Sequence, residues 1–205
     1  MNRTIRIGAD PFPPYQSYCA DGSVRGIDAD RVTAAFCAAG YDTEIILEDW
    51  PVVERMLNDG AVSAAFQVQP TPERLKKYRF SKLLRSAATE LISSRAELKL
   101  DSYRQIEERN LTLGVIEGYT NGPDIDALDS RVKRTYPDNR SLLLAISRGE
   151  TDLGVFDRGV KTFLMEENGI HNLYPVENMT FTRPLHVIFL DEALCGEFDA
   201  ALERL

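Results

Sequence analysis

The feature that most constrains the fold is a regular alternation of short apolar runs with longer segments of helical periodicity. In the first half this pattern predicts strands at 4–9, 43–47 and 62–66, and helices at 28–39 and 52–59. After an extended segment at 89–93 it begins again, with strands at 111–116, 153–156 and 185–189 and helices at 103–108, 142–148, 158–167 and 192–205. A turn at 118–122 is expected to open a further helix. Alternation of this kind is typical of parallel α/β sheets, whose ligands bind outside the carboxyl ends of the strands.

A connection from a helix through a glycine to a buried strand occurs twice in the chain. Residues 56–66 and 145–156 each contain the end of a helix, a glycine (Gly60 or Gly149), a polar corner and a buried strand. Glycine suits this place because the residue after a helix often adopts a left-handed conformation. The echo favours two α/β lobes of similar design over one continuous sheet.

The charge balance excludes one large class of partner. The formal net charge is −8 and the isoelectric point is near 4.9, so the chain has no basic surplus to neutralise a phosphate backbone. We therefore expect no nucleic-acid partner. No apolar run approaches the roughly 20 residues that span a bilayer, and residues 1–7 lack a signal-peptide pattern. The chain is either a cytosolic protein or an exported domain without its leader.

The reactive side chains do not form a metal or nucleophile motif. Cys19, Cys37 and Cys195 lie far apart in sequence and have no histidine at ligand spacing. We expect no metal site and no cofactor. Cys19 and Cys37 are either a disulfide of an exported protein or free thiols. The serines have no Gly-x-Ser-x-Gly elbow, so nothing supports a hydrolase.

Several motifs resemble one family along nearly the whole chain. In order they are Ile5-Arg6-Ile7-Gly8-Ala9-Asp10-Pro11-Phe12-Pro13-Pro14-Tyr15, Gly26-Ile27-Asp28-Ala29-Asp30, Trp50, Thr71-Pro72-Glu73-Arg74 ahead of Phe80-Ser81, Gly114-Val115-Ile116-Glu117-Gly118-Tyr119-Thr120, and Gly149-Glu150-Thr151-Asp152-Leu153-Gly154-Val155-Phe156-Asp157. They look like those of the family 3 extracellular solute-binding proteins, the amino-acid receptors of ABC importers and of some sensor ectodomains.

The resemblance implies an α/β, two-lobed periplasmic-binding-protein type 2 fold, in which each lobe is a sheet flanked by helices. Lobe 1 is expected at 1–88 plus 187–205 and lobe 2 at 89–186, with the ligand cleft between them. Two hinge strands, near 89–93 and 182–187, would join the lobes and allow them to close on a ligand.

The resemblance also implies a pair of opposite charges for a zwitterionic ligand. Arg74 matches the family arginine that binds the α-carboxylate, since a guanidinium fork fits a carboxylate bidentately. Its structural alternative is a surface arginine paired with Glu73. Asp157 matches the carboxylate that binds the α-ammonium, and its alternative is a plain helix N-cap.

Four further positions match ligand contacts of the relatives, and each has a structural alternative. Thr120 would complete the carboxylate site or be a simple turn residue. Phe12 and Trp50 would be aromatic walls or core residues. Asp10 would bind a polar or cationic ligand side chain or be a turn residue.

Two glutamines depart from the family pattern. Relatives commonly have Gly, Ser or Thr before the Thr-Pro-Glu-Arg motif, where this chain has Gln67 and Gln69. Either the ligand is smaller or differently shaped, or the glutamines contact it directly.

The resemblance implies a periplasmic or extracellular, monomeric protein that binds a small amino-acid-like solute without transforming it. The first hypothesis is a transport receptor that delivers its ligand to a membrane permease. The second is a sensor ectodomain linked to a membrane receptor. The third, a cyclohexadienyl dehydratase, would need a general acid such as Glu117 or Asp10 and has no histidine in the expected cleft.

Overall fold

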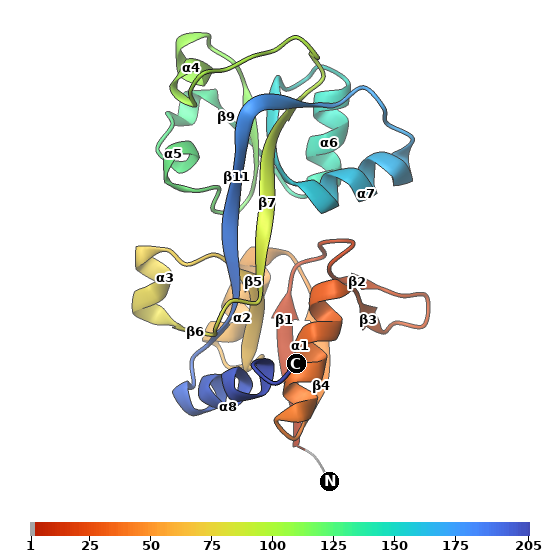
Figure 1. Ribbon diagram of the computed structural model, residues 1–205, viewed down its shortest axis with the longest axis vertical. Coiled ribbons are helices and arrows are strands. Elements are labelled where there is room, and N and C mark those ends of the chain that lie inside the picture. Colours follow the sequence, from red (N-terminus) through yellow and green to blue (C-terminus); the bar gives the residue numbers. More distant parts are fainter. Residues whose placement is uncertain (1–2) are drawn as a thin grey trace. The chain divides into compact units, whose positions relative to one another are not determined.

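The structure is a computed structural model that describes residues 3–205 of the 205-residue chain. Its residues divide into two compact units (Figure 1). Unit 1 comprises Met1–Ser86 and Pro184–Leu205, and unit 2 comprises Ala87–Arg183. Unit 2 is one continuous stretch of sequence, whereas unit 1 is built from both ends of the chain.

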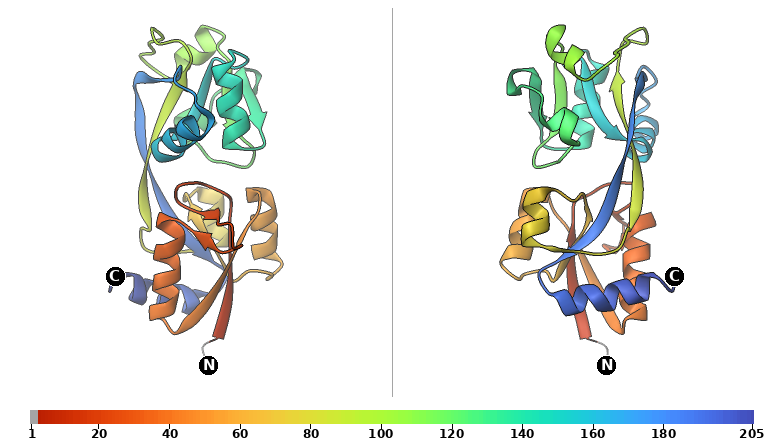
Figure 2. Two further views of the ribbon diagram at one scale, coloured as in Figure 1. Left: turned by 90° about the vertical axis from the view of Figure 1, so that its right-hand side faces the viewer. Right: turned by 60° about the vertical axis from the view of Figure 1, so that its left-hand side comes forward.

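Unit 1 is a sheet with helices on both faces. Its main strands follow the order β4 (Tyr41–Leu47), β1 (Arg3–Ala9), β5 (Ala64–Val68) and β11 (Tyr174–Phe189). The first three are parallel, while β11 runs antiparallel to β5. Helices α1 (Ile27–Ala38) and α8 (Glu192–Leu202) cover one face, and α2 (Trp50–Asn58) covers the other (Figure 2). The smaller elements are β2 (Ser17–Tyr18), β3 (Val24–Arg25), α3 (Pro72–Lys77) and β6 (Arg79–Phe80).

The side chains of β1 show why these layers form. Ile5, Ile7 and Ala9 alternate along the strand and belong to the core shared with α1 and α8. On the opposite side, Gly8 lets α2 approach closely, because a Cβ at Gly8 would lie 2.8 Å from Cγ1 of Val53. The carboxyl-terminal part of the strand, from Ile7 to Ala9, is therefore buried on both faces, as in parallel sheets generally.

Unit 2 repeats this design. Its strands follow the order β7 (Arg85–Ser93), β10 (Leu153–Asp157), β8 (Leu113–Ile116) and β9 (Lys133–Tyr136). β10, β8 and β9 are parallel, and β7 is antiparallel to β10. Gly114 and Gly154 lie beneath Leu142 and Ile146 of α6, close enough that a Cβ on either glycine would clash. The helices are α4 (Arg104–Glu108), α5 (Pro123–Asp126), α6 (Asn139–Ser147) and α7 (Arg158–Asn168), with a short 3₁₀ turn at Ser130–Val132.

Two strands pass from one unit into the other. The boundaries at 86/87 and 183/184 fall inside β7 and β11, which are neighbours in the strand order. The expected strand at 185–189 is only the end of β11, which begins eleven residues earlier, at Tyr174. Its first part alternates buried Val176 and Met179 with exposed residues, and this apolar signal is too sparse to be recognised in the sequence.

Candidate functional site

In unit 1 the candidate residues gather at the carboxyl edge of the parallel strands. Ile7 pairs with Ala64 and Gly8 with Ala65, and the same register places Asp10 level with Gln67. Trp50 follows the end of β4, the neighbouring strand on the other side of β1. Gln69 and Arg74 follow β5. The edge where α/β sheets bind their ligands therefore holds six of the eight residues predicted from sequence, namely Asp10, Phe12, Trp50, Gln67, Gln69 and Arg74.

Arg74 lies in a corner formed with Trp50 and Gln69. The Thr71 hydroxyl caps α3 by accepting the backbone N–H of Arg74 at 3.2 Å, which fixes the first turn of the helix. The guanidinium lies 5.1 Å from the centroid of the Trp50 ring and donates to the Gln69 backbone carbonyl at 3.3 Å. Arg74 is half-buried, whereas Glu73 beside it is exposed. It is thus positioned by its own loop, as a binding arginine needs to be.

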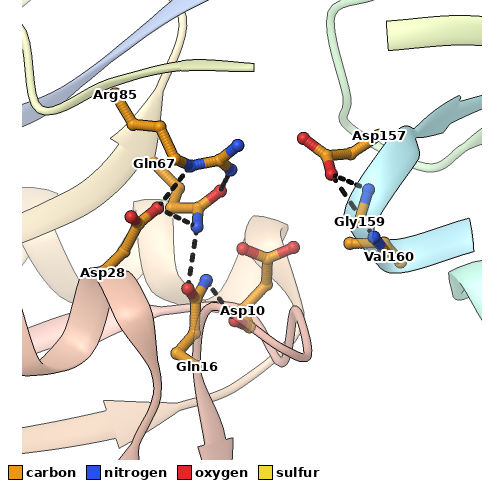
Figure 3. Close-up of polar contacts among 8 residues, drawn as sticks. All are labelled: Asp10, Gln16, Asp28, Gln67, Arg85, Asp157, Gly159 and Val160. Atoms are coloured by element: carbon orange, nitrogen blue, oxygen red, sulfur yellow. Dashed lines mark hydrogen bonds and ion pairs between the residues drawn. The ribbon is translucent and has the colours of Figure 1, made fainter. Parts of the chain in front are cut away.

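Gln67 is held in a polar network with Gln16, Asp28 and Arg85 (Figure 3). Its Nε2 donates to Oε1 of Gln16 at 2.8 Å and to Oδ2 of Asp28 at 2.5 Å, and its Oε1 accepts from Arg85 at 3.2 Å. Arg85 Nε also donates to Oδ2 of Asp28 at 2.9 Å. Asp28 is 1% exposed and Gln16 is fully buried, so these charges and dipoles are shielded from water.

The backbone of Gln67 is itself unusual. Its φ angle is 66°, a region that favours glycine. A non-glycine residue stays there only when its surroundings fix it, and the network of hydrogen bonds supplies that constraint.

Asp10, in the loop after β1, is connected to this network through Gln16. Gln16 Nε2 donates to the backbone carbonyl of Asp10 at 3.0 Å, and Asp10 is 8% exposed. Phe12 is 5% exposed and stacks on Tyr15, with ring centroids 5.9 Å apart. The Arg85 guanidinium lies 3.5 Å from the centroid of the Tyr15 ring. Phe12 and Trp50, which is 7% exposed, are therefore both well-buried residues next to polar groups of the site.

In unit 2 the corresponding edge holds Asp157 and Thr120. Leu153 pairs with Leu113 in parallel, and this register places Asp157 level with Glu117, three residues before Thr120. Asp157 is 2% exposed and caps α7, because its Oδ1 accepts the N–H groups of Gly159 at 2.8 Å and Val160 at 3.3 Å (Figure 3). Asp157 is thus the N-cap of α7, and the two hydrogen bonds fix the orientation of its carboxylate at the strand end.

Thr120 is placed by a buried arginine that the sequence does not single out. Arg183 is 8% exposed, and it donates to the backbone carbonyl of Thr120 at 3.0 Å and to the hydroxyl of Thr89 at 2.8 Å. Thr89 lies opposite Asp157 in the pairing of β7 with β10. Arg183 thereby ties the loop of Thr120 to β7.

Sequence reasoning missed Gln16, Tyr15, Arg85 and Arg183 as neighbours of the site. Asp28 appears in the sequence analysis only as part of the motif Gly26-Ile27-Asp28-Ala29-Asp30. The partners of the network lie 18 to 57 residues apart in sequence, and a positive φ at Gln67 leaves no mark in the sequence. The one available signal was the bulky residue at a position where small ones are usual.

Metal-ligand clusters, membrane-spanning helices and reactive cysteines would each point to a different function. Residues 3–205 contain no group of three or more metal-ligating side chains, and none of their helices is long and apolar enough to cross a bilayer. The three cysteines are free thiols, with Cys19 and Cys37 exposed. Burial raises the pKa of the Cys195 thiol to about 11, so this group stays protonated at neutral pH.

Solved structures share this architecture over the whole chain. An ancestral arginine-binding protein bound to arginine superposes with a TM-score of 0.86 at 19% identity, covering 100% of this chain and 92% of that one. A histidine kinase sensor domain with similarity to periplasmic binding proteins gives 0.87 at 19% identity, with coverages of 100% and 90%. The arginine-, lysine-, histidine-binding protein ArtJ from the thermophilic bacterium Geobacillus stearothermophilus gives 0.82 at 20% identity, with coverages of 98% and 89%.

These likenesses establish the two-lobed fold of the periplasmic binding proteins. No curated protein matches the chain in sequence. The sequence pattern of one family, however, matches residues 5–203, which is almost the entire chain. The protein therefore belongs to the bacterial extracellular solute-binding proteins, family 3.

Proposed function

We propose that the protein captures a small α-amino acid or a close analogue between its two units, and that hinge closure through β7 and β11 holds the ligand. The observation that carries the proposal is the placement of opposite charges at the two carboxyl edges. Arg74 stands at the edge of unit 1 and Asp157 at the edge of unit 2. A zwitterion has one group for each, and family 3 membership supplies the class of ligand.

Arg74 would bind the α-carboxylate and Asp157 the α-ammonium. Arg74 is half-buried and fixed by the Gln69 carbonyl and the Trp50 ring, so little side-chain freedom is lost on binding. The Asp157 carboxylate is oriented by two backbone N–H groups that donate to its Oδ1. Thr120, Phe12 and Asp10 would complete the enclosure of the ligand.

The first test is a thermal-shift screen of the twenty amino acids and small carboxylates, followed by calorimetry on the hits. A ligand at a hundred times its Kd adds about 2.7 kcal/mol to the free energy of unfolding. We expect an α-amino acid to stabilise the wild type and Arg74→Ala to lose the effect. If only amine-free acids bind, the ammonium role of Asp157 is wrong.

Asp157→Asn separates the charge of Asp157 from its capping role. Asparagine caps helices as well as aspartate, so the variant should fold while binding the ammonium at least about tenfold more weakly. Asp191→Asn is the matched control, because Asp191 caps α8 in the same way through the N–H groups of Ala193 and Leu194. Equal affinities of the Asp157→Asn variant and the wild type would remove Asp157 from the site.

We propose a transport role, in which the closed form delivers the solute to a membrane permease from the periplasm, and we expect the protein to be a monomer. The likeness to a histidine kinase sensor domain supports a second candidate, a sensing ectodomain. Import by cells that carry the matching permease would support the first role. Ligand-dependent phosphorylation by a kinase joined to this domain would support the second.

We also propose that the protein does not transform its ligand. His186 pairs with Val68 at the carboxyl end of β5, but its Nδ1 is hydrogen-bonded with the Ser81 backbone carbonyl at 2.8 Å. The two acids considered as general acids, Asp10 and Glu117, lie in different units. The bound amino acid should be recovered unchanged after prolonged incubation, as measured by mass spectrometry. Turnover of prephenate by the purified protein would contradict this and indicate a dehydratase.

A further inference from the structure

Two buried polar atoms in the described part of unit 1 have no hydrogen-bond partner. One is the indole N–H donor of Trp50 and the other is the side-chain carbonyl oxygen Oε1 of Gln69. Trp50 is 7% exposed, so its N–H is well removed from water. Buried polar groups in proteins are nearly always paired, and each exception needs an explanation such as a bound ligand.

The two atoms belong to one corner. The Arg74 guanidinium lies over the Trp50 ring at 5.1 Å and donates to the Gln69 backbone carbonyl at 3.3 Å, so Trp50 and Gln69 both adjoin Arg74 at the carboxyl edge of the sheet. One unpaired atom is a donor and the other is an acceptor.

The neighbouring glutamine shows the contrast. Both N–H groups of the Gln67 amide are donated, to Gln16 and Asp28, and its oxygen accepts from Arg85. The hydrogen-bonding groups of the Gln67 amide are therefore used within the protein, and we assign it no contact with the ligand. Of the two glutamines that depart from the family pattern, Gln69 is the one with an unpaired side-chain atom.

We infer that Trp50 and Gln69 bind a neutral carboxamide on the ligand side chain, which makes the ligand an amino acid of the glutamine or asparagine type. A carboxamide oxygen accepts from the Trp50 N–H while its NH₂ donates to Gln69 Oε1. A carboxylate has only acceptors and would leave Gln69 unpaired, and an ammonium or guanidinium has only donors and would leave Trp50 unpaired. The inference rests on the proposed function, in which Arg74 and Asp157 already bind the α-carboxylate and the α-ammonium.

Calorimetry with side-chain pairs of equal size tests the inference. We expect L-glutamine or L-asparagine to bind at least about tenfold more tightly than the corresponding acid and than L-lysine or L-arginine, since an unpaired buried group disfavours the wrong ligand. Tighter binding of the acid or of the cation would overturn the assignment. Equal affinity for glutamine, glutamate and alanine would overturn it too, while leaving the proposed amino-acid site in place. If no amino acid binds, the proposed function and this inference both fail.

Two conservative variants separate binding from packing. Trp50→Phe removes the N–H but keeps an aromatic face beside Arg74, and Gln69→Met removes the amide at similar length. Each should weaken binding of the carboxamide amino acid by about tenfold more than it weakens binding of L-alanine. An equal loss for all amino acids would mean that these atoms contact the shared head group and would overturn the inference. Gln105→Met on α4 is the matched control and should leave affinity unaltered.

The unliganded variants and one spectroscopic signal complete the test. Gln69→Met removes an unpaired polar atom at similar side-chain length and should not lower the melting temperature, whereas a hidden structural hydrogen bond would be revealed by a clear loss of stability. The chain has one tryptophan, so its ¹H–¹⁵N spectrum contains a single indole signal. Saturating L-glutamine should move that proton downfield, as expected for a new hydrogen bond, and L-alanine should not. An indole proton that does not move with L-glutamine would overturn the role of Trp50.

Discussion

At the scale of single residues, Asp28 shows how much a buried charge depends on its partners. Its side chain is 1% exposed and accepts from Gln67 and Arg85. Arg85 in turn stacks on Tyr15 and begins β7, a strand that crosses into unit 2. The first residue of a linking strand is thus fixed to the start of α1 through a buried ion pair.

Arg85→Met should destabilise the protein by about 3 kcal/mol, because the Asp28 carboxylate would stay buried without the compensating charge. Chemical denaturation monitored by circular dichroism measures the change. Arg25→Met is the matched control, since the ion pair of Arg25 with Asp30 is largely exposed and its loss should change stability much less. Similar losses in the two variants would contradict a special role for the buried pair.

At the scale of elements, two glycines differ in whether the surrounding structure leaves room for a side chain. Gly196 lies inside α8, and a Cβ there would meet no atom within 4 Å. Gly8 of β1 lies against Val53, where a Cβ has no room. The same substitution should therefore have opposite effects at the two positions.

Gly196→Ala should stabilise the protein by about 0.5–1 kcal/mol, because alanine loses less backbone entropy than glycine when the helix forms. Gly8→Ala should destabilise it by about 1–3 kcal/mol through overpacking. Melting temperatures of the two variants test both signs. A loss of stability in Gly196→Ala would indicate a contact on the exposed face of α8.

The elements that the sequence predicted well are those with dense local signals. Helix α1 was expected at 28–39 and occupies Ile27–Ala38, because its apolar residues recur at helical spacing and Gly40 follows it. The strand expected at 62–66 occupies Ala64–Val68 instead, since Ala61 and Val62 still bond back to Met56 of α2. Strand β9 and most of β11 were missed because their residues are largely polar and exposed.

The candidate site was predictable only in part, for a related reason. Arg74 and Asp157 stand in short local motifs, a capped turn and a strand end, which the sequence displays directly. The network of Gln67 depends on contacts between four separate segments and on a backbone angle of 66°. Such contacts exist only once the chain has folded.

At the scale of the whole molecule, capture of a ligand by hinge closure predicts a change in dimensions. The radius of gyration from small-angle X-ray scattering should fall when the wild type is saturated with its amino acid, because closure brings the two units together. Arg74→Ala, which should not bind, should show no change. A constant radius of gyration in the liganded wild type would contradict closure.

The division of the chain into two units affects the order in which they can fold during synthesis. Unit 2 is continuous, whereas unit 1 is completed only by Pro184–Leu205. Domains emerge from the ribosome in sequence order and fold as units. Unit 2 is therefore complete while Phe36 of α1 still lacks Phe198 of α8, whose ring centroid lies 4.8 Å away in the finished fold. Until the last helix has been synthesised, the nascent first unit leaves one face of its core open to water and to chaperones.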